Sequence, residues 1–512
     1  MDGECALLPL NKYPTYLRTQ KLELTLPSSL LKNFIHGHYV SNNDNKCFDV
    51  INPGTGGVIY STETADNAML EDAIASAKNG FTAWSQTPAI ERARILQRAA
   101  IILRERNDEL AKVEVQDTGK PWQEAVEVDV QTGADAIEYF ANLCPSMMGE
   151  QQSVNNDFFY TRHEPLGICL GIGAWNYPLQ IACWKAAAAL AAGNAMIFKP
   201  SEETPRGASL LAEIFIEAGV PAGVFNVVQG DGAVGNYLVK HPAIAKVSLT
   251  GEVNTGKKVM AAAAETLKNV TMELGGKSPL IVFEDADIDE AITGAMLANF
   301  YTQGEVCTHG TRVFVHKSLY SDFVARIVKR TRDNVIVGDP LNPQTNLGAL
   351  ISEGHMHKVL SYIQLGKDEG ATLALGGEQI KPEGCEEGFF VSPTIFTDCT
   401  DGMSIVREEI FGPVMSILSF ESEEEVIERA NNTDFGLAAG IFCNDIRRAH
   451  RVIAQLEAGI CWINAYGNSP VEMPVGGYKQ SGIGRENGVE TFKSYTQTKS
   501  IYVGMGKLEG PF

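Results

Sequence analysis

Apolar runs alternate with helix-like segments from about residue 166 onward. "LGICLGIGA" (166–174) is almost wholly apolar, as a strand buried on both faces should be. The segment 178–194 begins with Pro178 and stops at Gly193, which are typical of the two ends of a helix. The other predicted strands cover 195–198, 224–228 and 246–250. The next predicted helix covers 204–219. This alternation predicts a parallel sheet with helices on both faces and a ligand at the carboxyl ends of its strands.

Amphipathic segments flank this predicted sheet. Residues 65–115 are expected to form two surface helices that stop before Gly119 and Pro121. Their apolar positions at helical spacing are Leu70, Ile74, Ala77, Phe81, Ile95, Ala99 and Ile102. Thr204 and Pro205 are expected to cap the helix at 204–219. A second α/β unit is predicted from about 271 to 480, and the alternating segment 491–505 is predicted to be a strand that pairs with a neighbour.

Composition narrows the class of protein. The chain has 512 residues and 44% hydrophobic content, so more than one domain is expected. A net charge of -21 disfavours nucleic acid as a partner, because like charges repel. No apolar run is long enough to span a membrane, and the ten cysteines form no CxxC pair or zinc spacing. A reducing, cytoplasmic compartment is therefore expected, with a mitochondrial presequence as the lesser alternative because residues 1–30 mix acidic with basic residues.

Two turns suggest a nucleotide site. In "LTGEVNTGKKVM" (249–260), Gly251 and Gly256 stand between a predicted strand and a helix, where backbone N–H groups can approach a pyrophosphate. In "FKPSEET" (198–204), Lys199 and Glu202 stand at a strand end, where a carboxylate can accept from a ribose hydroxyl. The plainer alternatives are a tight strand–helix turn and an exposed charge pair.

Three further residues are candidates for chemistry. Cys307 lies between two glycines in "QGEVCTHGTRV", either as a nucleophile or as a buried filler. Glu273 lies among apolar residues, where burial raises a carboxyl pKa and makes it a base near neutral pH, or it caps a turn. Asn176 precedes a helix, and its amide either stabilises an oxyanion or caps that helix.

Taken together, these stretches resemble the aldehyde dehydrogenase family over nearly the whole chain after about residue 33. The motifs that carry the resemblance are "IGAWNYP", "GNAMIFKPSE", "VTMELGGKSP", "GEVCTHGTRVFV", "EEIFGPVMSI" and "GGYKQSGIGRENG". "QLEAGICWIN", "SPVEMPVGGYK" and "SYTQTKSI" are most similar to the betaine-aldehyde and trimethylaminobutyraldehyde branch of the family.

The resemblance implies NAD-dependent oxidation of an aldehyde to an acid. Cys307 would form a thiohemiacetal and then a thioester, Asn176 would stabilise the oxyanion, and Glu273 would activate water. Lys185 and Glu486 match positions near the catalytic centre, with Glu486 as a proton relay. The implied cofactor contacts are Lys199, Glu202, Gly251, Gly256, Trp175, Glu409 and Phe411.

The resemblance also implies a cationic aldehyde as substrate. A trimethylammonium group is best held by aromatic faces, and the matching aromatic residues are Tyr177, Trp184, Tyr301 and Trp462. Tyr177 and Trp184 are seven apart, which predicts one shared helix face. Val475 replaces a tryptophan of plant relatives, and each aromatic has core packing as its plainer role. Betaine aldehyde comes first, with 4-trimethylaminobutyraldehyde and ω-aminoaldehydes as alternatives.

The implied fold has a Rossmann-like NAD-binding domain, an α/β catalytic domain and a small β extension that builds homodimers or homotetramers. The predicted boundaries are 1–32 for an N-terminal extension, 33–146 and 167–272 for the NAD-binding domain, 273–485 for the catalytic domain, and 147–166 and 486–512 for the oligomerisation segments. Relatives in this branch also bind a structural potassium ion through backbone carbonyls, which leave no residue signature.

Three residues depart from the family pattern and keep rival hypotheses open. The family usually has glutamine at the position of Glu305. It often has asparagine at the position of His309, and serine or glycine at the position of Glu252. A carboxylate at 252 would weaken pyrophosphate binding unless it turns outward. His309 is expected to face away from Cys307 along a helix. A non-catalytic family member stays an alternative, whereas a cysteine hydrolase lacks a convincing partner for Cys307 and leaves Lys199 and Glu202 unexplained.

Overall fold

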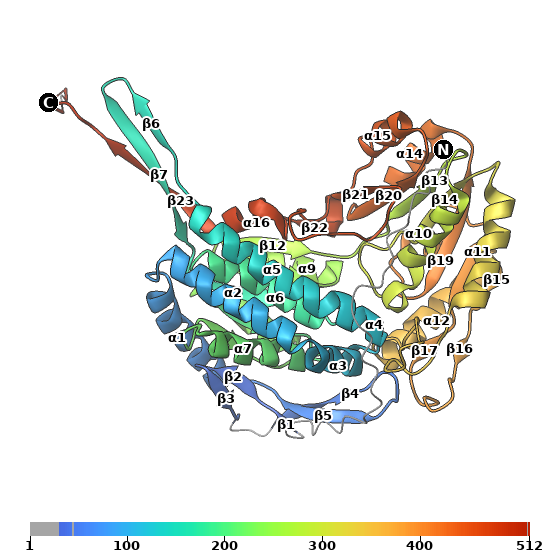
Figure 1. Ribbon diagram of the computed structural model, residues 1–512, viewed down its shortest axis with the longest axis horizontal. Helices are drawn as coiled ribbons and strands as arrows, with labels where there is room; N and C mark the ends of the chain where they lie inside the picture. Colours follow the sequence, from blue (N-terminus) through green and yellow to red (C-terminus); the bar gives the residue numbers. More distant parts are fainter. Residues whose placement is uncertain (1–29, 43–45, 509, 512) are drawn as a thin grey trace, which may run out of the picture.

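The computed structural model describes residues 30–42, 46–508 and 510–511, so the expectations for the first 29 residues lie outside it. Two large sheets dominate the molecule, one on each side of Figure 1. In order across the sheet, the eight-stranded sheet contains β22 (Gly482–Ile483), β12 (Asn269–Glu273), β11 (Ile244–Thr250), β8 (Ile168–Ile172), β9 (Ala195–Lys199), β10 (Phe225–Val227), β2 (Asn33–Ile35) and β3 (His38–Val40). Its five central strands are parallel, which confirms the predicted parallel sheet.

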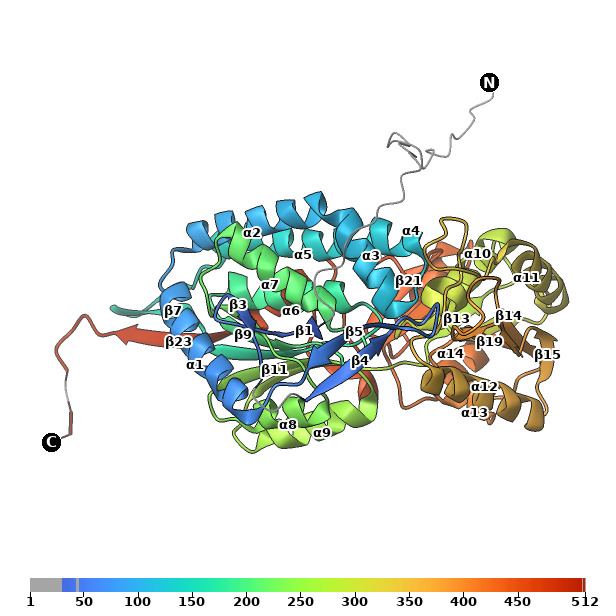
Figure 2. The same ribbon diagram turned by 90° about the horizontal axis from the view of Figure 1, so that it is seen from below.

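Helices cover both faces of this sheet, as the strand–helix alternation predicts (Figure 2). Figure 2 shows one group on one face, with α2 (Ala89–Glu105), α5 (Val130–Leu143), α6 (Pro178–Ala191) and α7 (Arg206–Ala218), and another on the opposite face, with α8 (Gly232–Lys240) and α9 (Val253–Ala264). α6 is buried almost all round, since its long alanine run lets neighbouring helices and strands approach closely.

The second sheet has seven strands: β15 (Thr372–Leu375), β18 (Thr394–Thr397), β19 (Val414–Phe420), β14 (Arg312–His316), β13 (Pro279–Val282), β20 (Ala438–Phe442) and β21 (Ile460–Ile463). All neighbours are parallel except β15 and β18. Its helices are α10 (Ile288–Phe300), α11 (Tyr320–Asn334), α12 (Glu353–Asp368), α13 (Ser404–Arg407), α14 (Glu423–Asn431) and α15 (Ile446–Ile453). β22 pairs with β12, so residues 482–483 join the first sheet rather than the unit in which the sequence-based boundary puts them.

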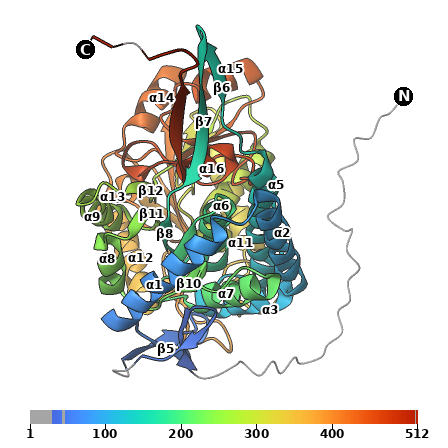
Figure 3. The ribbon, with the colours of Figure 1, turned by 90° about the vertical axis from the view of Figure 1, so that its left-hand side faces the viewer.

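Three small sheets complete the fold. β1 (Leu30–Leu31), β5 (Val58–Glu63) and β4 (Cys47–Ile51) form one, and β16 (Gln379–Ile380) with β17 (Phe390–Val391) forms another. The third joins β23 (Thr496–Val503), β7 (Asp157–Pro165) and β6 (Gln151–Val154) into an arm that projects from the body (Figures 1 and 3). The predicted strand at 491–505 therefore has its partner within the chain, although its first residues belong to α16 (Gly488–Ser494).

The helix predictions for 65–115 and 204–219 need correction. Three helices occupy the first region: α1 (Asn67–Trp84), α2 and α3 (Asn107–Thr118). Arg106 leaves the helical backbone between the last two, and neither glycine nor proline marks that break in the sequence. Thr204 does not cap α7, because Pro205 occupies the N-cap position without a side-chain bond.

Candidate active site

The predicted nucleophile Cys307 enters the site on a turn from the second unit. α10 ends at Phe300, the short helix η3 (Tyr301–Gly304) follows, and Cys307 lies on the turn between η3 and β14. Its side chain is half-buried. Burial, then the carboxylates of Glu409 and Glu273, raise the pKa of the thiol to about 12, partly offset by backbone N–H groups. The thiol is therefore neutral at neutral pH and needs a route for its proton before it can attack.

Asn176 comes from the first unit and reaches the turn before Cys307. It lies between β8 and α6, is 6% exposed, and its Nδ2 donates to the carbonyl of Glu305 at 2.9 Å. This amide does not cap α6, whose N-cap residue is Tyr177. Because one Nδ2 hydrogen is enough for that bond, the other remains for an oxygen near Cys307.

Glu273 is the last residue of β12 and is 8% exposed. Its Oε1 has no hydrogen-bond partner among the described residues. Burial raises the pKa of this carboxyl well above its ordinary value, the charge of Glu486 raises it further, and Lys185 and Arg485 lower it. A buried carboxyl with a free oxygen and a raised pKa is a stronger base than an exposed one, which suits it to take a proton.

A buried ion pair lies beside Glu273. Lys185 Nζ is 3.0 Å from Glu486 Oε1, and Ser248 Oγ donates to the same oxygen at 2.6 Å. Lys185 and Glu486 are each 1% exposed, and Glu486 Oε2 has no partner within the described part of the chain. The structure thus brings together three predicted catalytic residues, two of which lie 301 positions apart.

Two glycines after Glu273 let the nucleophile and a second carboxylate approach. A Cβ at Gly275 would lie 1.9 Å from Glu409 Oε2, and one at Gly276 would lie 2.7 Å from the carbonyl of Cys307. The N–H of Gly276 donates to Glu409 Oε1 at 2.9 Å, and burial raises the pKa of Glu409 to about 7. Any larger residue at 275 or 276 would push Glu409 or Cys307 away.

Comparison with known proteins decides the family. A sequence profile described as the aldehyde dehydrogenase family matches residues 39–501. The chain belongs to the aldehyde dehydrogenase family. It is 62% identical to a betaine aldehyde dehydrogenase of Vibrio vulnificus over 481 residues, covering 94% of this chain and 99% of that protein.

Solved structures of the family have the same fold. An aldehyde dehydrogenase from Bacillus cereus in complex with NAD+ is 43% identical, with a TM-score of 0.90 over 93% of this chain and 97% of that one. A betaine aldehyde dehydrogenase from Staphylococcus aureus in complex with NAD+ is 36% identical, with a TM-score of 0.91 over 94% and 97% of the two chains. These comparisons confirm the predicted family and fold class.

The predicted cofactor residues of this aldehyde dehydrogenase lie mainly at the carboxyl ends of strands in the first sheet. Lys199 ends β9, is 4% exposed, and pairs with the exposed Glu202 at 3.0 Å. Gly256 lies in α9, where a Cβ would come within 2.6 Å of Leu274. Gly251 is uncrowded, so the close packing of α9 depends on the second glycine rather than the first.

Aromatic rings complete this side of the site. Trp175 meets Phe411 edge-to-face at a centroid distance of 5.2 Å, and it meets His355 at 5.4 Å. The Nε2–H of His355 donates to the carbonyl of Phe411 at 2.6 Å, which holds a residue whose φ is +62°. Burial lowers the pKa of His355 to about 4, so its ring is neutral. Sequence reasoning missed His355, which no local motif distinguishes.

The four predicted substrate aromatics lie on different segments of the chain. Tyr177 precedes α6 with φ −136°, so helical spacing does not relate it to Trp184 and the predicted shared face is wrong. Trp184 lines a cavity of about 300 Å³ with Tyr139, and Tyr177 and Tyr301 are not among its lining residues. Trp462 is 6% exposed and donates from Nε1 to the carbonyl of Asn468 at 2.7 Å. Tyr177 and Tyr301 are half-buried and lie on the segments that carry Asn176 and Cys307.

The three departures from the family pattern do not block the site. Glu252 is exposed and accepts from Asn254 at 2.9 Å, so it turns outward. Glu305 is 1% exposed, and its carboxyl accepts from the N–H of Ile351 and from Gln303. His309 is buried on a turn rather than on a helix, which corrects the predicted local structure but agrees with a packing role.

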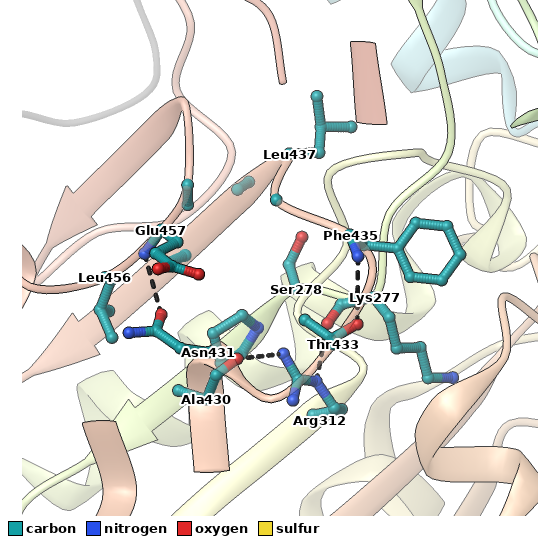
Figure 4. A pocket seen from close by; sticks show the side chains of 15 residues that line it. Lys277, Ser278, Arg312, Ala430, Asn431, Thr433, Phe435, Leu437, Leu456 and Glu457 are labelled. Carbon is teal, nitrogen blue, oxygen red and sulfur yellow. Dashed lines mark hydrogen bonds between the residues drawn. The ribbon is translucent and has the colours of Figure 1, made fainter. Parts of the chain in front are cut away.

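A small cavity elsewhere does not belong to this site. Figure 4 shows the side chains around it, which come from residues 277–279, 312 and 430–458. Its volume of about 10 Å³ leaves room for little more than one water molecule. Within the described ranges, no cluster of His, Cys, Asp or Glu is arranged to hold a metal ion, and no helix is long and apolar enough to cross a membrane.

Proposed function

We propose that this aldehyde dehydrogenase oxidises betaine aldehyde to glycine betaine with NAD. The observation that carries the proposal is the 62% identity to the Vibrio vulnificus betaine aldehyde dehydrogenase, extending over 94% of the chain. Tyr177 and Tyr301 support it, since aromatic faces suit a trimethylammonium group that cannot be hydrogen-bonded. 4-Trimethylaminobutyraldehyde and ω-aminoaldehydes are the competing substrates, because the same faces would take them.

The cofactor side fits NAD rather than a 2′-phosphorylated dinucleotide. Glu202 is exposed at the end of β9, where its carboxylate can accept from a ribose hydroxyl and would repel a phosphate. Lys199 beside it can donate to the same ribose. Glu409 and Phe411 would contact the nicotinamide ribose, Trp175 would shield it, and Gly251 and Gly256 border the pyrophosphate turn. When bound, NAD supplies a hydride acceptor.

Cys307 performs the first step. Its thiol must lose a proton, and Glu273, a nearby carboxyl with an oxygen unpartnered among the described residues, would take it and pass it to the Lys185–Glu486 pair before the last step. The thiolate attacks the aldehyde carbon, and the carbonyl oxygen becomes an oxyanion within a thiohemiacetal. The free Nδ2 hydrogen of Asn176 and the backbone N–H of Cys307 would donate to that oxyanion.

Glu273 performs the last step. Once the hydride has left, the substrate is held on Cys307 as a thioester, and Glu273 takes a proton from a water that attacks it. The carboxylic acid departs and Cys307 is regenerated. The Lys185–Glu486 pair would carry the proton onward, since Glu486 has an unpartnered oxygen and its charge raises the pKa of Glu273.

We propose that the arm formed by β6, β7 and β23 pairs subunits into a homodimer or homotetramer. The arm supports this because most of its residues are exposed or half-buried although they belong to a regular sheet. We also propose the division into NAD-binding, catalytic and oligomerisation segments that the family resemblance implies. Light scattering on the purified chain tests the subunit number.

A free catalytic thiol works in a reducing compartment, so we propose cytoplasmic action as well.

The substrate proposal is tested by NADH absorbance with NAD and betaine aldehyde, for the wild type and Cys307→Ala. Wild-type turnover that disappears in Cys307→Ala supports the reaction, and the same assay with 4-trimethylaminobutyraldehyde and aminobutyraldehyde ranks the substrates. Cys47→Ala, at an exposed cysteine in β4, serves as the matched control and should keep full activity. Folded wild-type protein without turnover on any aldehyde would favour a non-catalytic member instead.

A further inference from the structure

The segment just before Cys307 has an unusual backbone. Thr302, Gln303 and Gly304 follow one another with φ values of +47°, +43° and +80°. Only glycine adopts such angles freely, and a β-branched residue such as threonine does so rarely. Strain of this kind costs on the order of 1–3 kcal/mol for each residue and persists only where surrounding contacts impose it. Specific contacts must therefore hold this segment, and these contacts set the position of Cys307.

Glu124 supplies the main contacts. Its carboxyl oxygens accept from the backbone N–H of Thr302 at 3.1 and 3.0 Å, and Oε2 also accepts from Thr302 Oγ1 at 2.8 Å. Glu124 ends the short helix α4 (Trp122–Glu124) and is 8% exposed. One buried side chain therefore satisfies both donors of the first strained residue, from a position 178 residues away in sequence.

The same hydroxyl connects the segment to a substrate aromatic. Tyr177 Oη lies 2.7 Å from Thr302 Oγ1, and since that hydroxyl gives its proton to Glu124, Tyr177 donates to it. The other contact of the Tyr177 ring is Lys120, whose ammonium lies 3.8 Å from the ring centroid. Lys120 is fully buried and paired with Asp129 on the π-helix η1 (Ala125–Asp129). Lys120 thus holds the ring of Tyr177, and Glu124 holds its hydroxyl through Thr302.

We propose that Glu124 is a positioning residue that, through Thr302, holds both the nucleophile turn and the ring of Tyr177 for the cationic aldehyde. This rests on the proposed function for the identity of the substrate, but not for the effect on Cys307. Lys120 supports the arrangement by fixing the ring from one face. Hydrogen bonds in such a chain reinforce one another, so the loss of either end weakens both contacts.

A double-mutant cycle with Glu124→Gln and Thr302→Val tests the proposal. Glutamine keeps the shape of Glu124 but removes an accepting oxygen, and valine keeps the shape of Thr302 but removes its hydroxyl. The readouts are kcat/KM with betaine aldehyde, the rate at which iodoacetamide alkylates Cys307, and the NAD dissociation constant. Each single variant should lower kcat/KM about tenfold or more, as expected when a buried hydrogen bond is lost and its partner is left unpaired. The alkylation rate should fall with it, and NAD affinity should stay unchanged.

The double variant should be no worse than the poorer single variant, because both changes remove one contact. Glu109→Gln is the matched control, since Glu109 in the adjacent helix α3 also accepts two hydrogen bonds, from Arg106, and does not contact the turn. The proposal would be overturned if the effects of the two changes on kcat/KM multiply in the double variant. It would also be overturned if the single variants fold and their alkylation rates match that of the wild type. Alkylation needs no aldehyde, so this readout judges Glu124 even if betaine aldehyde proves not to be the substrate.

Discussion

Two carboxylates that the sequence singles out, Glu202 and Glu273, end up in opposite surroundings. Glu202 lies at the cofactor edge of the first sheet, exposed to water and 3.0 Å from Lys199. Glu273 ends β12 at the same edge, with β11 and β8 between β12 and β9, but it is buried, its Oε1 has no partner among the described residues, and its pKa is raised. The first is a candidate for binding and the second a candidate base, because burial raises the pKa of Glu273 although Lys185 and Arg485 lower it.

The glycines repeat this contrast. Gly251 at the cofactor turn has room for a side chain, whereas Gly275 and Gly276 next to Glu273 have none. A side chain at 251 is therefore tolerated sterically, whereas one at 275 or 276 must displace Glu409 or Cys307. Variants placed in the two regions should separate in the size of their effects.

Glu273→Gln should produce the largest contrast with Glu202→Gln. Removing the base should lower steady-state turnover by about 10²–10⁴-fold, because Cys307 loses its proton acceptor and the thioester loses the base that activates water. Glu202→Gln should mainly raise the KM for NAD, because the proposed role of its carboxylate is to bind the ribose. Rapid-quench mass spectrometry of the enzyme detects the thioester. Equal losses of turnover in the two variants would break the comparison.

The pH dependence of Cys307 sharpens the same contrast. With a thiol pKa of about 12 in the enzyme without NAD, the thiolate fraction is small at neutral pH and grows as pH rises. Alkylation of Cys307 should therefore rise about tenfold per pH unit between about pH 7 and 9, because pH stays below the pKa. Peptide mass spectrometry distinguishes Cys307 from the exposed Cys47. A plateau within this range would show that the thiol pKa is far lower.

Gly275→Ala should act through Glu409. A Cβ there would meet Glu409 Oε2 at 1.9 Å, so the carboxylate must move away from the N–H of Gly276. We expect NAD affinity to fall by about tenfold, in line with overpacking costs of about 1–3 kcal/mol. Gly232→Ala is the control, since nothing lies within 4 Å of a Cβ at that position. Titration calorimetry with NAD compares the two.

Glu305→Gln should have the smallest effect. The Glu305 side chain accepts from the N–H of Ile351 at 2.9 Å and from Gln303 Nε2 at 3.0 Å. A glutamine oxygen keeps the first bond, and the Gln303 amide, whose oxygen has no partner among the described residues, can turn to accept the second. Asn176 is bonded to the backbone carbonyl of Glu305, which the substitution leaves in place. We expect kcat/KM to stay within about twofold, as for a substitution that leaves no buried polar group unpaired. A large loss would mean that the charge itself has a role in the site.

The sequence alone determined the family and the parallel sheet, and it predicted the central residues. The apolar runs at β8 and β9 and the glycine-bounded helices are local signals, and so are the motifs around Asn176, Glu273 and Cys307. The strand signals can be read from the sequence because a strand buried on both faces needs apolar side chains along its whole length.

Only the tertiary structure decided which residues meet these central ones. Glu124, Lys120 and His355 carry no motif, and the bond from Thr302 to Glu124 spans 178 positions. The break at Arg106 and the place of Tyr177 outside α6 likewise came from packing. No spacing along a chain encodes a contact between distant segments, since it is burial and hydrogen-bond satisfaction in the folded molecule that select it.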